Sequence, residues 1–227
     1  MRLRSLAAFR LLYGVAVVGM AAWILYSSSP GAVVSRSYAA YNGRALVSHP
    51  DITFPDVQLP YNTPLQPVSA TEAKNVQNGY ILFAYPACPF CRNLLPILAD
   101  VASQQNITIY YCKLDDYRDK FAFNPATNQP EKIISEKDGY LALLDWLSDY
   151  LDDYTVNDPN GNSIPVGEKR IMAPTLIAVK DGNPLSKWQL SAVAEVKEAN
   201  EANGAYAPWD AALQGKVSDA LLQYLAG

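Results

Sequence analysis

Two cysteines three residues apart stand between an apolar strand and a helix in the middle of the chain. Residues 80–85 form a continuous apolar run of six, which predicts a strand buried on both faces. The sequence Cys88-Pro89-Phe90-Cys91 follows, and leucines at helical spacing then predict a helix to about residue 104. A second β-rich run covers residues 107–114. A strand, a helix and a strand in this order predict a parallel, right-handed βαβ unit.

Cys88 and Cys91 occupy a position that favours a reactive thiol. In a first helical turn, residues three apart bring their Cα atoms within the roughly 4.4–6.8 Å that a disulfide requires. The free N–H groups and the dipole of the helix N-terminus stabilise a thiolate, the nucleophile of thiol–disulfide exchange. We therefore expect a Cys88–Cys91 disulfide in the oxidised protein, with Cys88 attacking and Cys91 resolving. The alternatives are a static disulfide and half of a zinc site, which only Cys112 and His49 are left to complete.

Residues close to Cys88 and Cys91 in sequence suggest how the protein contacts its substrate. Pro89 suits the first turn of a helix, where its missing N–H costs little. Tyr85, Pro86 and Phe90 predict an apolar, aromatic surface for an extended polypeptide. Arg92 has two interpretations, a charge that lowers thiol pKa values or a solvated helix charge.

Cys112 also has two interpretations. It lies near the carboxyl end of the second β-rich run, next to the strand that leads to the pair, so it approaches the redox site or is a buried structural cysteine.

The rest of the chain divides into segments of different character. Residues 35–67 carry five prolines and no sustained period, which predicts an extended linker, a stalk or a segment draped over the domain. Residues 117–169 interrupt the alternation of strands and helices, and the amphipathic pattern over 135–154 predicts a helical insertion. Residues 175–180 and 186–190, joined through Asp-Gly-Asn, predict an antiparallel hairpin at a sheet edge.

Three further segments carry helical signals. Ser69 and Glu72 have the spacing of a capping box, which predicts a short helix to about Val76. Residues 192–205 favour a helix or a mobile loop, and residues 208–225 predict a final helix with one apolar face.

The first 34 residues have the layout of a signal or membrane anchor. Arg2, Arg4 and Arg10 precede the uncharged run 11–26, so the positive-inside rule places the N-terminus in the cytoplasm and the rest outside. Sixteen helical residues span only about 24 Å of a ~30 Å hydrocarbon core, but the uncharged stretch continues to the end of this segment. We expect residues 1–34 to be an uncleaved anchor, with a cleaved secretory signal as the alternative.

Charge and composition exclude several classes of function. Three of the 18 Lys and Arg residues lie within the first 30, so the remainder carries 15 basic and 22 acidic residues. A domain this acidic argues against a nucleic-acid partner. Three cysteines are too few for a disulfide scaffold, and a single histidine, His49, excludes most histidine-based catalysis and metal chemistry. We therefore expect no cofactor and no metal.

The order of these elements resembles the thioredoxin-like superfamily. A short helix, an apolar strand, CPFC, a helix and a strand are followed by Ala173-Pro174-Thr175, an edge hairpin and a final helix. The resemblance implies an α/β fold with a central mixed sheet flanked by helices, here over residues 68–227 with the helical insertion at about 117–169. It also implies that Pro174 is cis and that Ala173 contacts the bound substrate. We expect the substrate-binding residues to be Ala173 and Pro174 with Pro89 and Phe90, which lie between the two cysteines.

A narrower similarity links the chain to the bacteriocin transport accessory proteins of Gram-positive bacteria, through the anchor, the CPxC motif, the Tyr-Tyr pair in the second strand and the insertion. It implies a membrane-tethered or secreted thiol–disulfide oxidoreductase outside the cytoplasm. Exported cysteine-containing polypeptides would be its substrates, and a membrane redox partner would recycle the cysteines. The alternative is a non-catalytic accessory or adaptor protein of a secretion or bacteriocin export system. Leu82 replaces the buried Asp of thioredoxins proper, which argues against efficient thioredoxin-type reductase activity. The direction of electron flow depends on the relative stability of the oxidised and reduced forms, which the sequence does not fix.

Overall fold

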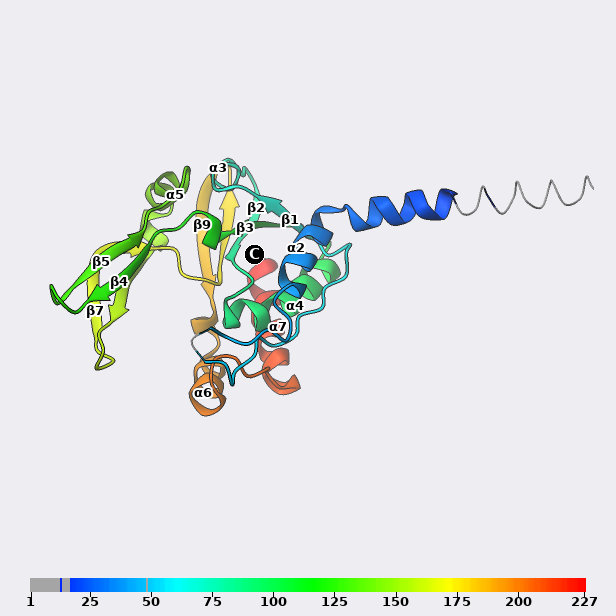
Figure 1. Cartoon of the computed structure of the whole chain (residues 1–227). Helices are drawn as coiled ribbons and strands as arrows, with labels where there is room; N and C mark the ends of the chain where they lie inside the picture. The colour runs from blue at the N-terminus through cyan, green and yellow to red at the C-terminus, as the bar shows by residue number, and fades with distance from the viewer. Residues whose placement is uncertain (1–12, 14–16, 48) are drawn as a thin grey trace, which may run out of the picture.

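A mixed five-stranded sheet forms the centre of the computed structural model, which describes residues 13, 17–47 and 49–227 (Figure 1). The strand order is β1-β3-β2-β8-β9. The strands are β1 (Leu65–Val68), β2 (Gly79–Ala84), β3 (Ile109–Lys113), β8 (Thr175–Lys180) and β9 (Asn183–Gln189). β1 and β2 run parallel to β3, whereas β8 runs antiparallel to both β2 and β9. The predicted parallel βαβ unit and the predicted edge hairpin are confirmed.

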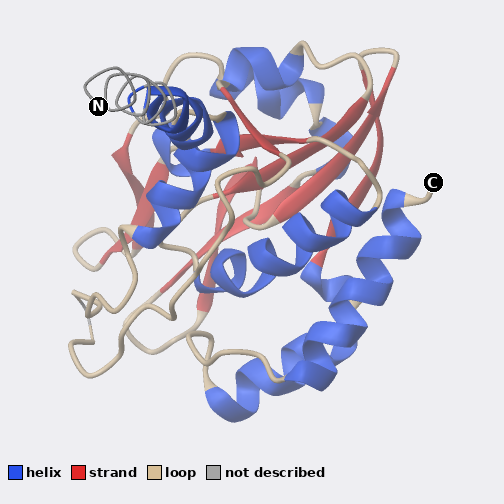
Figure 2. Ribbon diagram, turned by 90° about the vertical axis from the view of Figure 1, so that its right-hand side faces the viewer, coloured by secondary structure: helices blue, strands red, loops and turns tan. Residues whose placement is uncertain are grey.

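Helices cover both sides of this sheet (Figure 2). The helices are α2 (Pro30–Ala39), α3 (Ala70–Lys74), α4 (Pro89–Gln104), α5 (Tyr140–Trp146), α6 (Ala194–Asn203) and α7 (Ala211–Leu225). Short 3-10 turns are η1 (Leu114–Asp116), η2 (Ser148–Tyr150) and η3 (Leu190–Ala192). α2, α4 and α7 pack on one face, and α3 and α5 pack on the other. This mixed α/β arrangement is compatible with a thioredoxin-like fold.

The two-sided cover explains the continuous apolar run in β2. Leu82 and Ala84 join the core formed with α4, whereas Ile81 and Phe83 join the core formed with α3 and α5. Side chains alternate between the faces of a strand, so a strand covered on both sides needs apolar residues at every position. Burying each such Leu or Phe contributes about 1.5–3 kcal/mol.

The short helices predicted from end signals are present. Ser69 accepts a hydrogen bond from the Glu72 N–H at 3.2 Å, and the Glu72 carboxylate accepts one from the Ser69 N–H at 2.7 Å, which completes the capping box of α3. α6 occupies the segment for which a helix or a mobile loop was expected. α7 buries the predicted face of Leu213, Val217 and Leu221.

The segment before residue 68 belongs to the folded domain, which corrects the expected linker and domain boundary. α2 begins with Ser29 as its cap and buries Ala32, Val34 and Tyr38 in the core. The Ser35 hydroxyl donates a hydrogen bond to the Leu59 carbonyl at 2.7 Å, and β1 completes the sheet. The chain between α2 and β1 is draped over the domain, which was one of the alternatives expected for residues 35–67. The prolines in this region lie in turns that connect packed segments. The spacing of the prolines alone does not distinguish such a packed segment from an extended stalk.

The insertion is mainly β-structure, so the prediction of a helical insertion was wrong. It contains two antiparallel hairpins, β4 (Lys120–Asn124) with β5 (Gln129–Ile134) and β6 (Asp152–Asn157) with β7 (Ser163–Arg170). Only α5 and η2 remain of the helix expected over 135–154. The apolar spacing persists for two turns, with Tyr140 and Leu143 buried, but Tyr-Thr-Val then enters a strand, as its β-branched and aromatic residues favour.

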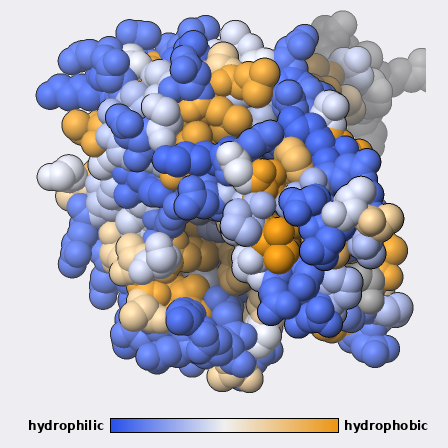
Figure 3. Space-filling view, turned by 90° about the vertical axis from the view of Figure 1, so that its left-hand side faces the viewer, coloured by the Kyte–Doolittle hydropathy of each residue, from blue (hydrophilic) through white to orange (hydrophobic). Residues whose placement is uncertain are grey.

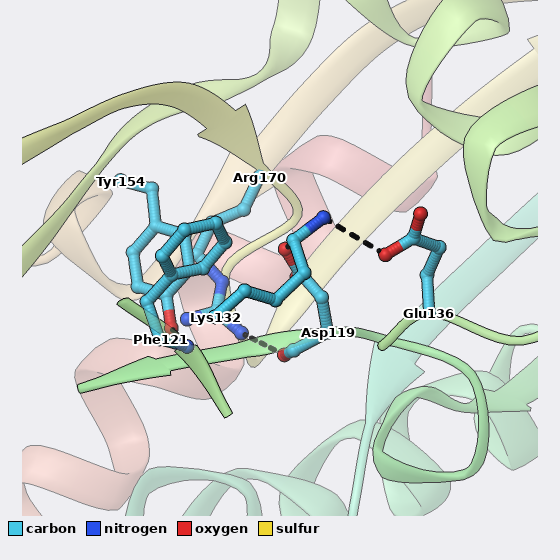
Figure 4. A network of polar contacts seen from close by, with 6 residues as sticks. All are labelled: Asp119, Phe121, Lys132, Glu136, Tyr154 and Arg170. Atoms are coloured by element: carbon cyan, nitrogen blue, oxygen red, sulfur yellow. Dashed lines mark hydrogen bonds and ion pairs between the residues drawn. The ribbon is translucent and has the colours of Figure 1, made fainter. Parts of the chain in front are cut away.

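A cluster of charged and aromatic side chains joins the two hairpins (Figure 4). The Arg170 guanidinium lies 3.8 Å from the centre of the Tyr154 ring, and the Tyr154 hydroxyl accepts a hydrogen bond from the Phe121 N–H at 2.9 Å. Lys132 Nζ lies 5.2 Å from the Phe121 ring and 3.9 Å from the carboxylate of buried Asp119. A two-stranded hairpin is marginally stable alone, so this cluster supplies much of what holds the insertion together.

Within residues 13, 17–47 and 49–227, no single helix is long and apolar enough to cross a membrane. The helices Val17–Ser27 and Pro30–Ala39 pass that test of length and composition only as a pair, bent by 69°. The expected anchor, residues 1–34, lies partly outside the described residues.

Candidate redox site

Cys88 caps the N-terminus of α4, directly after the carboxyl end of β2. Its backbone N–H donates to the Tyr85 carbonyl at 3.1 Å, and its carbonyl accepts from the Arg92 N–H at 3.1 Å. Pro89 occupies the first turn, as predicted. The turn that carries Cys88 is therefore fixed at both ends, by the strand and by the helix.

The two thiols and one backbone carbonyl form the centre of the site. Cys88 and Cys91 are free thiols, with only 2% and 1% of their surfaces exposed. Cys88 Sγ accepts a hydrogen bond from the Cys91 backbone N–H at 3.2 Å. The Cys88 thiol donates to the Ala173 carbonyl at 3.5 Å. The predicted residues Cys88, Cys91 and Ala173 are thus brought together, and the disulfide between the cysteines stays a prediction.

The surroundings shift the acidities of the two thiols in opposite directions. Burial opposes ionisation of Cys88, but hydrogen bonds from Cys91 and from the Phe90 N–H, with the charge of Arg118, outweigh it and lower its pKa. Burial, and then the adjacent Cys88 sulfur, raise the pKa of Cys91 well above its ordinary value. Cys88 is therefore the more acidic of the two thiols, and the more readily ionised one.

The Ala173–Pro174 peptide bond is cis, as the resemblance implied. It lies in the loop before β8. The hydroxyl of Thr175, the first residue of β8, donates to the Met172 carbonyl in this loop at 2.7 Å and accepts from Gln189 of β9 at 2.9 Å. These bonds attach the loop to the edge strand β9. The Ala173 carbonyl is consequently held in position against Cys88.

A groove of about 1100 Å³ begins beside this loop. Its lining includes Phe90, Ala173 and Pro174, residues of η3 and α6, and Val193 between these two helices. Figure 3 shows this side of the molecule, where apolar side chains gather in a hollow in the lower half. Three of the four predicted substrate-contact residues thus lie along one depression, while Pro89 is not among its lining residues.

Cys112 lies on the opposite face of the sheet. β3 alternates so that Tyr111 packs with the Cys88 and Cys91 face, and Cys112 packs with Ile81 and Phe83 on the other. Burial, and then the charge of Asp116, raise its pKa to about 12. Cys112 is therefore a structural thiol and is not positioned to complete a zinc site. Among the residues that the structure describes, no group of three or more His, Cys, Asp or Glu side chains is arranged to hold a metal ion.

Arg92 fits neither interpretation drawn from the sequence. Its side chain is 1% exposed, and its guanidinium donates to the carbonyls of Tyr38, Pro55 and Pro86 at 2.6–3.1 Å. It also bonds Asn42 Oδ1. Arg92 thus fastens the segment between α2 and β1 to the turn before Cys88.

Arg118 supplies the charge that the sequence interpretation sought in Arg92. It is half-buried just after η1, and its guanidinium lies 4.5 Å from the centre of the Tyr85 ring. The sequence signal that could have identified Arg118 is its position after the second parallel strand, because loops that follow parallel strands meet at the same sheet edge. Within the described part of the chain no carboxylate lies within 4 Å of this guanidinium, whereas Lys113 nearby pairs with Asp115 and Asp116.

No family model, curated protein sequence or solved structure matches this chain. The function is therefore argued from the geometry of the dithiol, the carbonyl opposite it and the groove.

Proposed function

We propose that this protein is a thiol–disulfide oxidoreductase of the thioredoxin-like superfamily, tethered to the membrane outside the cytoplasm and acting on cysteines of exported polypeptides. The observation that carries the proposal is the asymmetry of the dithiol. Cys88 caps the helix, accepts the Cys91 N–H and has a lowered pKa, whereas the pKa of Cys91 is raised. A static disulfide needs no such difference between its two sulfurs.

The exchange proceeds in two balanced steps. The Cys88 thiolate attacks one sulfur of a substrate disulfide, so a Cys88–substrate disulfide forms and the other substrate sulfur leaves as a thiolate that takes up a proton. Cys91 then loses its proton and attacks Cys88 Sγ, which forms the Cys88–Cys91 disulfide and releases the second substrate thiol. The substrate gains two electrons and the protein loses them. Run in reverse, the same steps oxidise a substrate dithiol.

The groove supports a polypeptide as the substrate. An extended segment lying along Phe90, Ala173 and Pro174 brings its own cysteine to Cys88, the sulfur of which faces the Ala173 carbonyl at 3.5 Å. The lining is largely apolar, which suits unfolded chains with exposed apolar side chains.

The tether rests on the sequence of the N-terminus. Basic residues precede an uncharged run, and disulfides persist outside the cytoplasm. Turnover requires a membrane redox partner that returns the cysteines to their starting state.

Trapping of mixed disulfides tests the roles of the cysteines. In the full chain we expect Cys88→Ala to abolish exchange with a disulfide-bonded peptide and Cys91→Ala to accumulate adducts through Cys88. Cys112→Ala is the matched control and should exchange like the wild type. Equal adduct yields through Cys91 in the Cys88→Ala variant would overturn the assignment.

The reduction potential separates the oxidoreductase from the adaptor alternative. Equilibration with glutathione and then with stronger dithiols should place the Cys88/Cys91 pair between about −120 and −270 mV. A potential near −120 to −200 mV indicates an oxidase or isomerase, and one near −270 mV indicates a reductase. A disulfide that resists reduction below about −300 mV would favour a non-catalytic adaptor.

A further inference from the structure

Three aromatic rings cluster where the N-terminal helix meets the domain. Trp23 and Tyr26 belong to the helix Val17–Ser27, whereas Tyr61 belongs to the loop before β1. The Tyr61 ring centre lies 6.4 Å from that of Trp23 and 5.4 Å from that of Tyr26. The Arg36 guanidinium lies 5.7 Å from the same ring. We call these four side chains the aromatic collar.

The helix that carries Trp23 and Tyr26 is apolar, and most of its large side chains are not covered by the described part of the protein. Its large apolar side chains are 47–73% exposed, namely Val17, Val18, Met20, Trp23, Ile24 and Leu25. Figure 1 shows this helix, in blue, projecting away from the domain. Contact of so much apolar surface with hydrocarbon is favourable in free energy, whereas its contact with water is unfavourable.

The junction between this helix and the domain is fixed by hydrogen bonds and close packing. The Ser29 hydroxyl donates to the Tyr61 carbonyl, and Arg36 Nη1 donates to the Ser27 carbonyl. At Gly31, a Cβ atom would lie only 2.4 Å from the Thr63 carbonyl oxygen, so the backbones are in contact there. The direction in which the helix leaves is therefore set by the domain.

We propose that the aromatic collar seats the domain on the outer surface of a lipid bilayer, with the part of the helix Val17–Ser27 that precedes Trp23 in the hydrocarbon and the rings at headgroup level. Trp and Tyr prefer this level because their rings are apolar and their N–H and O–H groups remain solvated. The Arg36 guanidinium beside them suits lipid phosphates. The proposal rests on the membrane tether proposed above and is independent of the exchange chemistry.

Seating by the collar also orients the redox groove. In Figure 1 the helix leaves on the right, beyond α2, whereas the hairpins of the insertion lie on the left. The groove includes Asp152 at the base of the insertion and therefore opens on the side away from the collar. A domain held in this way presents its groove to polypeptides in solution and not to the lipid surface.

Depth-dependent fluorescence quenching tests this arrangement in the full chain. The reporter variant carries Trp23→Phe with Tyr61→Trp, and its matched control carries Trp23→Phe with Leu185→Trp, on the exposed edge strand β9. Each is reconstituted into phosphatidylcholine vesicles whose acyl chains are brominated near the headgroup, brominated near the chain end or unbrominated. The Trp23→Phe variant gives the fluorescence of the other tryptophans, which is subtracted.

We expect bromine near the headgroup to reduce the position-61 signal about twofold and bromine near the chain end to reduce it less, as for interfacial rings. The position-185 signal should not change. An unquenched signal at position 61 in protein that floats with the vesicles would overturn the seating while leaving the tether intact. Stronger quenching near the chain end would place the collar inside the hydrocarbon and also overturn it. Protein that does not float would overturn the tether, and none of these outcomes alters the thiol assays.

Discussion

Replacing Arg92 with Met should destabilise the protein far more than a usual single substitution does. The guanidinium donates to the buried carbonyls of Tyr38 and Pro86, and to Pro55 and Asn42 at partly buried positions. A hydrogen bond to a charged group contributes about 1.5–3 kcal/mol, and a buried acceptor without a partner costs about 1–3 kcal/mol. Water can replace the donor only at the partly buried acceptors. The two buried carbonyls therefore dominate, and the expected loss is about 4 kcal/mol.

For a chain of this size, such a loss lowers the Tm by about 8–16 °C. Thermal unfolding of the full chain in detergent, followed by circular dichroism, measures it. Arg44→Met is the matched control, because the exposed Arg44 guanidinium lies 5.5 Å from the centre of the Tyr41 ring, and such contacts contribute about 0.5–1 kcal/mol. Limited proteolysis should cut the Arg92→Met variant first in the segment between α2 and β1. An Arg92→Met variant as stable as Arg44→Met would refute the view that Arg92 fastens this segment.

Three other perturbations have defined outcomes. Arg118→Gln should raise the pKa of Cys88 and therefore slow the alkylation of Cys88 by iodoacetamide near neutral pH. Lys113→Gln is the control and should not slow it, because this substitution removes a charge that is already paired. Equal alkylation rates in the two variants would contradict the role of Arg118. Because the pKa of Cys112 is about 12 in the folded state and ordinarily 9.0, the unfolded chain ionises first and stability falls as pH rises from about 9 towards 12. Denaturant unfolding of Cys112→Ala should show about 1 kcal/mol less stability at neutral pH and a shallower alkaline loss, and an unchanged alkaline slope would count against burial as the cause. Ser69→Ala should cost about 1 kcal/mol of unfolding free energy, and Ser69→Thr, which keeps the capping hydroxyl, should cost less.

The features predicted correctly from sequence depend on local signals. The apolar run of β2, the helical leucines of α4 and the capping box of α3 each identify an element within a few residues. The position of Cys88 and Cys91 at a helix N-terminus could be predicted because it depends on residues adjacent to them in the sequence. The insertion was mispredicted because α5 supplies two turns of genuine helical periodicity that the strand-forming residues of β6 then override.

The features missed depend on contacts between distant segments. Arg92 reaches carbonyls up to 54 residues away, and nothing in its neighbourhood distinguishes it from a solvated helix charge. The charge of Arg118 lowers the pKa of Cys88, and its guanidinium lies over the ring of Tyr85, which is far from it in the chain. α2 was taken for part of an anchor and linker because its apolar residues bury against β1 and α4, elements that follow it in the chain.

The sheet that separates Cys112 from the other two thiols also restricts how the chain can be oxidised. Three cysteines can form a single disulfide in three ways, yet the folded protein offers only the pairing across the first turn of α4. An oxidant that meets the chain before it folds has access to all three pairings, two of which this sheet cannot contain. A disulfide that includes Cys112 in the isolated protein would therefore show that oxidation preceded folding.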